Sequence, residues 1–201
     1  MRNCSYGQTR NFCALEKYAI KLRLRNAINY IDYFTKSYKK NISIIELGCG
    51  YSGNNLLAIK KKNPDSSCTG IDLFINPELK SNEKMNFIEA DINKWKPEKT
   101  YDCVLSLAVI EHLTDLQGHF NLISDCLSPN GIAIISTPLP HAHIIIWLLS
   151  LIKIGNEEYN DHKLYLTKAG IESLAKISNL KILKHETVSI GFNRIYLMIK
   201  N

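Results

Sequence analysis

One stretch of the sequence constrains the fold more than any other: residues 44–53, which read IIELGCGYSG. An apolar run over 42–47 contains an acid, and glycines follow at positions 48, 50 and 53. A G-x-G-x-x-G loop between a strand and a helix is typical of proteins that bind a nucleotide-like ligand. The loop therefore predicts an α/β fold, and leaves open whether the ligand is a dinucleotide, a nucleoside triphosphate or another nucleoside.

Strand-like apolar runs recur along the chain with helical segments between them. They cover residues 42–47, 67–74, 85–91, 101–109 and 131–138. Several are almost continuously apolar, as expected of parallel strands that are buried on both faces. Two final runs, 180–188 and 194–200, are joined by only five residues, which is too short for a parallel crossover. The sequence therefore predicts a doubly wound, mostly parallel seven-stranded sheet with an antiparallel C-terminal hairpin.

The remaining segments complete a single predicted domain over residues 1–201. Residues 8–38 read as one or two helices before the first strand, and residues 139–163 interrupt the alternation like an inserted cap. Thr114 and Gln117 match a T-x-x-Q capping box, which predicts the start of a helix. Thr167 is the predicted N-cap of the helix that precedes the hairpin.

The net charge of +6 is concentrated near the N-terminus, where residues 1–40 hold nine Lys or Arg against two acids. This basic segment is either a solvated helix face or a contact for an anionic substrate or a membrane surface. No nucleic-acid partner is expected. The apolar run 144–152 is too short to span a bilayer, for which about 20 residues are needed. Six cysteines without a C-x-x-C pair, and no apolar leader, predict reduced thiols in a cytoplasmic protein.

Three acids lie at or near the ends of the first three predicted strands, where ligands bind in an open α/β sheet. Glu46 lies beside the glycines, and Asp72 and Asp91 end the second and third runs. Asp72 suits a ribose diol, and Asp91 can accept a hydrogen bond from the amine of an adenine. Glu46 would repel a pyrophosphate but would attract an ammonium group. S-adenosylmethionine combines a ribose, an adenine and a positively charged tail, and so fits all three acids.

The chain resembles the class I S-adenosylmethionine-dependent methyltransferases, in particular the small-molecule branch that includes the ubiquinone- and menaquinone-type enzymes. The matching blocks lie within residues 42–138 and read IIELGCGYSG, GIDLF, FIEADI, YDCVLSLAVIEHL and LSPNGIAIISTP. The resemblance implies a Rossmann-like methyltransferase fold, S-adenosylmethionine as cofactor and methyl transfer to the O, N or C atom of a small-molecule acceptor. The acceptor would be lipid-like, quinone-like or sugar-derived.

The resemblance also implies a role for individual residues in holding the cofactor. Gly48 and Gly50 would let the backbone approach the methionine part, and Glu46 would face its ammonium group. Asp72 would hold the ribose hydroxyls. The remaining contacts would come from Leu73, Asp91 and Ile92 around the adenine and from Leu107 at the methionine segment.

His112, which follows the fourth strand, is the leading candidate for a catalytic base, because imidazole titrates near neutral pH. Some quinone-type relatives carry Glu-x-x-Glu-His here and bind a divalent metal; this chain lacks the first acid, so no metal site is predicted. His162 and Tyr165, in and just after the cap, are the predicted acceptor contacts. Two other functions are weighed against this one: a catalytically silent partner-binding protein with the same fold, and an NAD-binding oxidoreductase.

Overall fold

The computed structural model describes residues 14–37, 41–139, 166–188, 191 and 193–201. The strands in these ranges are β1 (Ser43–Leu47), β2 (Ser67–Asp72), β3 (Asn86–Glu89), β4 (Tyr101–Leu107), β5 (Leu127–Pro138), β6 (Leu180–Val188) and β7 (Asn193–Lys200). The helices are α1 (Ala14–Ser37), α2 (Asn54–Lys62), α3 (Pro77–Lys80), α4 (Leu116–Cys126) and α6 (Lys168–Ile177), with a 3₁₀ turn, η1, at Ile110–His112.

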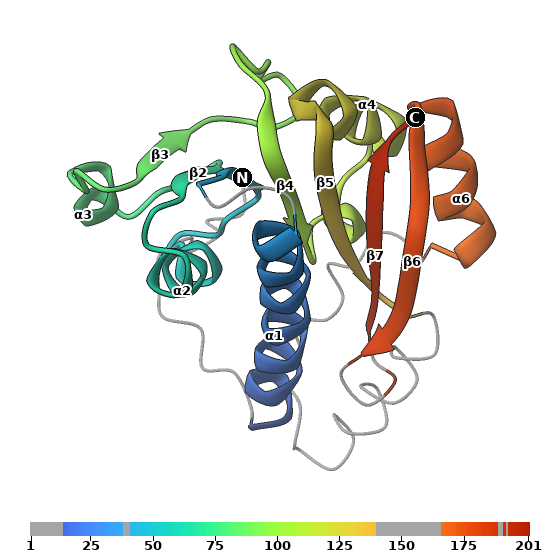
Figure 1. The fold of residues 1–201 in the computed structure, drawn as a ribbon, viewed down its shortest axis with the longest axis horizontal. Helices are drawn as coiled ribbons and strands as arrows, with labels where there is room; N and C mark the ends of the chain where they lie inside the picture. The colour runs from blue at the N-terminus through green and yellow to red at the C-terminus, as the bar shows by residue number, and fades with distance from the viewer. Residues whose placement is uncertain (1–13, 38–40, 140–165, 189–190, 192) are drawn as a thin grey trace, which may run out of the picture.

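The seven strands form one sheet in the order β3-β2-β1-β4-β5-β7-β6 (Figure 1). Strands β1 to β5 pair in parallel, whereas β7 runs antiparallel to both β5 and β6. The predicted fold class is therefore confirmed, including the reversed C-terminal hairpin. The order of connection reverses between β1 and β4, and the carboxyl ends of these neighbours mark the switch point at which such sheets bind ligands.

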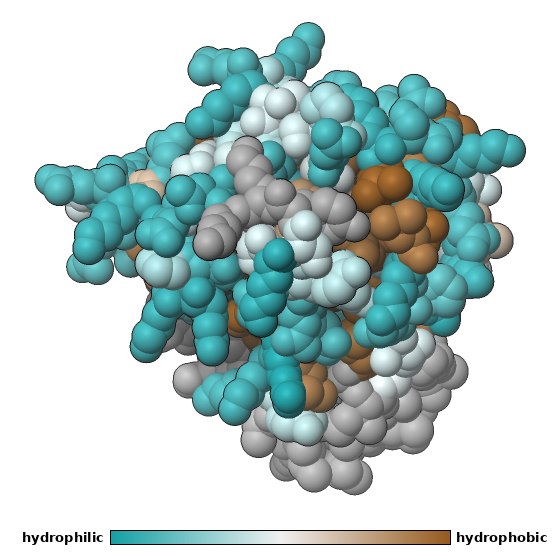
Figure 2. All heavy atoms as spheres, viewed as in Figure 1, coloured by the Kyte–Doolittle hydropathy of each residue, from teal (hydrophilic) through white to brown (hydrophobic). Residues whose placement is uncertain are grey.

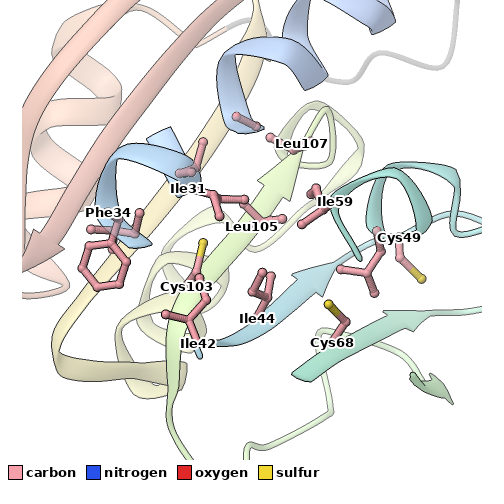
Figure 3. Close-up of a cluster of buried hydrophobic side chains, with 14 of the residues drawn as sticks. Ile31, Phe34, Ile42, Ile44, Cys49, Ile59, Cys68, Cys103, Leu105 and Leu107 are labelled. Carbon is pink, nitrogen blue, oxygen red and sulfur yellow. The ribbon is translucent and has the colours of Figure 1, made fainter. Parts of the chain in front are cut away.

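Helices cover both faces of the sheet because neighbouring residues of the central strands are apolar on both sides. Ile44 packs in a cluster with α1 and α2, while the next residue, Ile45, packs with α4 and α6 on the opposite face. Figure 3 shows the first cluster, in which Ile31 and Phe34 of α1 lie over the sheet near Leu105 of β4. This burial fixes α1 across the same face of the sheet toward which Glu46 projects.

The view of the molecule that includes α1 is mainly hydrophilic (Figure 2). Apolar side chains gather beside α1 over β6 and β7, and Leu183 of β6 is 52% exposed. Within the residues described, no helix has the length and apolar character needed to cross a membrane. The apolar run 144–152 lies outside the described residues.

Several details differ from the expectations. Strand β3 is shorter than predicted and ends at Glu89, so Asp91 lies two residues beyond it. Strand β5 begins at Leu127, earlier than predicted, because α4 passes into it directly. The helix expected before β1 is present as α1, over Ala14–Ser37.

The capping box at Thr114 is wrong. The N-cap of α4 is Asp115, whose Oδ1 accepts a 2.8 Å hydrogen bond from the amide of Gly118. Gln117 instead donates its side-chain amide to Asn121 and Ser178. The N-cap predicted at Thr167 is confirmed, since its hydroxyl accepts from the amide of Gly170.

Four of the six cysteines lie in the described residues, and all four are buried free thiols, as predicted: Cys49, Cys68, Cys103 and Cys126. Burial raises the pKa of each of these thiols, which keeps them protonated at neutral pH.

Candidate functional site

The glycine loop lies at the switch point and is fixed by backbone hydrogen bonds to the next strand. The amides of Gly48 and Cys49 both donate to the carbonyl of Ile71, at 2.8 and 3.0 Å. Gly53, which precedes α2, donates to the carbonyl of Gly50. The loop is therefore held between the ends of β1 and β2, with α2 starting directly after it.

Gly48 and Gly50 adopt left-handed backbone conformations, with φ of 76° and 72°, and so need glycine for the same reason. Their surroundings differ. A Cβ on Gly48 would lie 2.6 Å from Cγ2 of Val109, whereas a Cβ on Gly50 would meet nothing within 4 Å. Gly48 thus allows the segment after β4 to pack closely, and Gly50 leaves open space beside the loop.

Glu46 projects from β1 toward α1 and α2 and is fully buried. Its Oε1 accepts a 2.9 Å hydrogen bond from the side-chain amide of Asn55 in α2, and its Oε2 is buried without a hydrogen-bond partner among the described residues. Burial raises the pKa of this carboxyl to about 7, against the opposing effects of Asn55 and of the guanidinium of Arg23. A buried carboxylate with one free oxygen can hold a cationic group.

Two further charged residues lie close to this part of the site, Arg23 near Glu46 and Glu111 near Arg23, and neither was predicted from the sequence. Arg23 of α1 has a buried Nε without a hydrogen-bond partner in the described part of the chain, and both Glu46 and Glu111 act on its pKa. Glu111 of η1 is 3% exposed, and burial raises the pKa of its carboxyl to about 7. The sequence signal for Glu111 was its place beside His112; Arg23 lay among other basic residues and carried none.

Asp72 ends β2 and touches the glycine loop. Its Oδ2 accepts a 2.8 Å hydrogen bond from the amide of Gly50, and its Oδ1 accepts from the amide of Phe74 at 3.4 Å. A carboxylate oxygen has about two acceptor positions, so each oxygen of the half-buried Asp72 can take one more donor. Asp72 is therefore oriented by the backbone and can accept a pair of hydroxyl groups.

Asp91 lies in the turn after β3, close to the end of β2, because the amide of Ala90 donates to the carbonyl of Asp72. Its Oδ1 accepts from both the backbone and side-chain amides of Asn93. These bonds lower the pKa of the Asp91 carboxyl, which keeps it ionised. The neighbouring Ile92 is half-buried against the core.

Three large apolar residues near these acids are exposed rather than buried. They are Leu73 at 52%, Phe74 at 45% and Tyr51 at 41%. Tyr51 and the segment after Phe74 are joined by a hydrogen bond from the amide of Asn76 to the carbonyl of Tyr51. Leu73 is therefore not a core residue, and it offers an apolar surface next to Asp72 that a flat ring could cover.

The segment after β4 contains the other predicted residues. Leu107 is 4% exposed and packs in the cluster under α1, at the tip of β4 (Figure 3). Ala108 has a φ of 59°, which is strained for a residue with a Cβ, and its amide donates to the carbonyl and hydroxyl oxygens of Ser136. His112 is exposed at the end of η1.

The structure therefore gathers most of the predicted cofactor residues at one edge of the sheet. Glu46, Gly48, Gly50 and Asp72 meet directly around the glycine loop, while Leu73, Asp91 and Ile92 lie at the ends of β2 and β3. His162, Tyr165 and the cap at 139–163 lie outside the described residues, apart from Leu139. Among the described residues, no three His, Cys, Asp or Glu side chains are placed to share a metal ion.

Comparison with known proteins identifies the family. The profile of the family described as "Methyltransferase domain" matches residues 18–185. A ubiquinone biosynthesis O-methyltransferase of Rickettsia bellii is 33% identical over 122 residues, which are 55% of this chain and 49% of that protein. A malonyl-[acyl-carrier protein] O-methyltransferase of Ilyobacter polytropus is 29% identical over 119 residues, covering 56% and 46%. The chain thus spans about half the length of these relatives.

Solved structures agree in fold. The plantazolicin methyltransferase BpumL, crystallised with a triazolic desmethylPZN analog and SAH, superposes with a TM-score of 0.69 at 22% identity over 92% of this chain and 89% of that one. The magnesium protoporphyrin IX methyltransferase of Synechocystis, with bound SAH, gives a TM-score of 0.68 at 13% identity over 98% and 90%. By its sheet order, its glycine loop and the match over residues 18–185, the chain belongs to the methyltransferase domain family.

Proposed function

We propose that the chain transfers a methyl group from S-adenosylmethionine to a small-molecule acceptor. The observation that carries this proposal is Glu46, a fully buried carboxyl beside the glycine loop whose Oε2 has no hydrogen-bond partner among the described residues. Burying such a group without a partner costs about 1–3 kcal/mol or more. A cationic ligand group that pairs with Oε2 would recover this free energy, and the ammonium group of the methionine part has the required charge.

The other loop and strand-end residues fit the rest of the molecule. Open space beside Gly50 lets a ligand lie against the backbone. Asp72 keeps an acceptor position on each oxygen for the two ribose hydroxyls. The exposed side chain of Leu73 can cover one face of the adenine. In this proposal Asp91 and Ile92 contact the polar edge of the adenine, and Leu107 contacts the methionine segment. A pyrophosphate would be repelled by Glu46, which disfavours NAD.

S-adenosylmethionine, when bound, supplies the methyl group on a sulfonium that is already a strong electrophile. The chain's own residues have to align the acceptor and exclude water. In this proposal, His112 takes the proton from an acceptor hydroxyl or amine. It lies at the end of η1, after β4, and is exposed.

The acceptor is proposed as a small molecule. The relatives named above act in ubiquinone biosynthesis or on malonyl-[acyl-carrier protein]. A trans-aconitate 2-methyltransferase of Escherichia coli O157:H7 is also similar, at 27% identity over 134 residues. His162 and Tyr165 are the proposed acceptor contacts, within a single domain over residues 1–201. The basic segment 1–40 is proposed to meet an anionic substrate or a membrane surface. Four buried free thiols support a reducing, cytoplasmic location.

The first test is calorimetric binding of S-adenosylmethionine and S-adenosylhomocysteine to the wild-type chain and to Asp72→Ala. We expect both compounds to bind the wild type with Kd values between about 1 μM and 1 mM, the usual span for metabolites, and Asp72→Ala to bind at least about tenfold more weakly. Glu98→Gln, an exposed acid before β4, is the matched control. If neither compound binds the wild type, the proposal is wrong.

Activity is then tested by mixing the chain and methyl-labelled cofactor with a metabolite extract and identifying the labelled product. A labelled small molecule supports the proposal. Cofactor binding without any labelled product, across extracts and a panel of quinone, acid and sugar acceptors, would instead favour a catalytically silent protein that keeps the fold.

A further inference from the structure

Two buried carboxyl groups lie close to the half-buried side chain of one arginine, and the three residues come from three different elements. Arg23 comes from α1, Glu46 from β1 and Glu111 from η1. The Nε of Arg23 and the Oε2 atoms of both acids are buried without hydrogen-bond partners in the described residues. Both carboxylates raise the pKa of Arg23 against the effect of its burial, so the arginine is electrostatically coupled to each of the two acids. We call these residues the buried triad.

The buried triad adjoins the site from two sides. Glu46 lies two residues before Gly48 in the loop. Glu111 lies two residues after Val109, whose side chain fills the space where a Cβ on Gly48 would lie. The two acids therefore flank the place proposed for the methionine part of the cofactor, one from β1 and one from the segment after β4.

The buried triad has one more acid than base, so with both acids ionised it carries one uncompensated negative charge. Holding that charge away from water is costly, and each carboxyl has its pKa raised to about 7 by burial. Burial therefore favours a state in which one of the two acids is protonated. A cation that enters the site can replace this proton.

The two forms of the cofactor differ by one positive charge, which is the charge needed to neutralise the fully ionised buried triad. S-adenosylmethionine has an ammonium, a carboxylate and a sulfonium, and so carries one net positive charge. S-adenosylhomocysteine has lost the sulfonium charge and is neutral overall. S-adenosylmethionine can neutralise the fully ionised triad. S-adenosylhomocysteine leaves the extra negative charge of the triad uncompensated.

We propose that Arg23, Glu46 and Glu111 select the sulfonium form of the cofactor over its demethylated product, an inference that rests on the proposed function. The triad releases a proton to the solvent when the sulfonium form binds and keeps that proton when the product binds. The selectivity would rise with pH, which would favour exchange of spent cofactor for fresh cofactor. In this scheme Glu46 contacts the ligand, and Arg23 and Glu111 are positioning residues that set the charge around it.

Other polar and ionisable groups lie close to the triad. Asn55 of α2 is a neutral donor to Glu46, and Asp72 at the end of β2 adds a negative charge. The thiols of Cys49 in the loop and Cys68 in β2 have raised pKa values and stay protonated. His112, next to Glu111 on η1, is exposed to water.

The test is calorimetric titration of the wild-type chain with each compound at pH 7, in two buffers of different ionisation enthalpy. We expect S-adenosylmethionine to release at least about 0.3 proton more than S-adenosylhomocysteine, and the ratio of the two affinities to rise about tenfold between pH 6 and pH 8, a shift that one linked proton can produce. Glu111→Gln should bind both compounds with a ratio that is almost independent of pH. The control Glu98→Gln should behave as the wild type.

The outcomes separate this inference from the proposed function. If both compounds bind the wild type with equal proton release and a constant affinity ratio, the inference is wrong while the proposed function stands. If Glu111→Gln folds and keeps the wild-type pH dependence, the inference is also wrong. The wild-type measurement does not depend on that variant folding. If neither compound binds the wild type, both proposals fail together.

Discussion

The side-chain amide of Asn55 donates a 2.9 Å hydrogen bond to Oε1 of Glu46 and leaves Oε2 of the same carboxylate without a partner among the described residues. One oxygen thus fixes the orientation of the carboxylate, and the other is available to a ligand. Because Asn55 is the second residue of α2, the helix that follows the glycine loop also orients the acid that precedes it.

Removing this hydrogen bond should weaken cofactor binding. The bond from Asn55 favours the ionised form of Glu46, so Asn55→Ala should raise the pKa of Glu46 further and reduce the ionised fraction at pH 7. We expect the Kd for S-adenosylmethionine to rise about tenfold at pH 7, the value of one charge-assisted hydrogen bond. The loss should shrink at pH 8.5, where Glu46 ionises in both proteins. Calorimetry at the two pH values measures it.

The matched control is Asn54→Ala, which makes the same change at the preceding, exposed residue of α2. Its Kd should stay within about twofold of wild type, since surface substitutions cost at most about 0.5 kcal/mol. Equal affinities of Asn55→Ala and the wild type at pH 7 would show that the orientation of Glu46 does not matter for binding.

The two glycines should fail in different ways when replaced by alanine. Gly48→Ala combines a left-handed backbone with a Cβ placed 2.6 Å from Cγ2 of Val109, and should cost about 2–4 kcal/mol of unfolding free energy. Gly50→Ala meets no neighbour and should cost only the backbone term of about 1–2 kcal/mol. Its added methyl group would stand in the space proposed for the cofactor, so its main loss should be in affinity. Urea denaturation without ligand and calorimetry separate the two effects.

A double variant checks the cause of the first effect. Val109→Ala removes the atoms that collide with the new Cβ, so Gly48→Ala with Val109→Ala should be more stable than the sum of the two single losses predicts. Additive losses would mean that the backbone alone, and not the contact with Val109, makes glycine necessary at position 48.

His112→Gln should lower kcat without changing cofactor affinity. Loss of a general base costs about 10²–10⁴-fold in rate, and the exposed His112 makes no part of the glycine loop. With an acceptor identified, steady-state kinetics should also lose the ascending limb of the pH–rate profile in this variant. If kcat falls less than threefold and the pH profile is unchanged, His112 is not the catalytic base and has only a structural role in η1.

His119 should make the protein sensitive to acid. It is 4% exposed, its Nε2 lies 2.9 Å from the hydroxyl oxygen of Ser106, and burial lowers its pKa to about 4. A histidine with a lowered pKa stabilises the fold fully above its unfolded value of about 6.5, and that contribution is lost as the pH falls toward 4. The unfolding free energy of the wild type should therefore fall more steeply over this window than that of His119→Gln.

Denaturation in urea at half-unit steps from pH 7 to pH 4 measures the difference. His185→Gln, a change at an exposed histidine of β6, should leave the wild-type slope unaltered. Parallel curves for the wild type and His119→Gln would mean that His119 is protonated equally in the folded and unfolded chains.

The fold could be predicted from the sequence because its determinants are local and periodic. The continuous apolar runs of β1, β4 and β5 identify strands covered on both faces, and the short link of four residues between β6 and β7 dictates an antiparallel pair. The acid–glycine spacing at 46–50 likewise predicted which side chains would meet at the loop. The start of α4 is not fixed by the sequence, because Thr114 and Asp115 are both good capping residues and the structure uses the second.

Arg23 could not be assigned to the site from the sequence. It is separated from Glu46 by 23 positions, and the same helix carries four other Lys or Arg: Lys17, Lys21, Arg25 and Lys36. Only the packing of Ala27, Ile31 and Phe34 against the sheet decides which basic residue of α1 turns inward. Contacts of this kind depend on how the whole helix is rotated about its axis, and a short sequence motif does not predict that rotation.

The left-handed backbone at Ala108 has a consequence for engineering. Glycine would relieve the strain there, so a screen for thermostability should favour Ala108→Gly. The same substitution would loosen the connection between β4 and η1 and so spread the positions that His112 samples. Selection for heat resistance at this residue would therefore reduce the local order around His112 that a transfer reaction requires. An ancestral or consensus library should then contain variants that are more stable but slower.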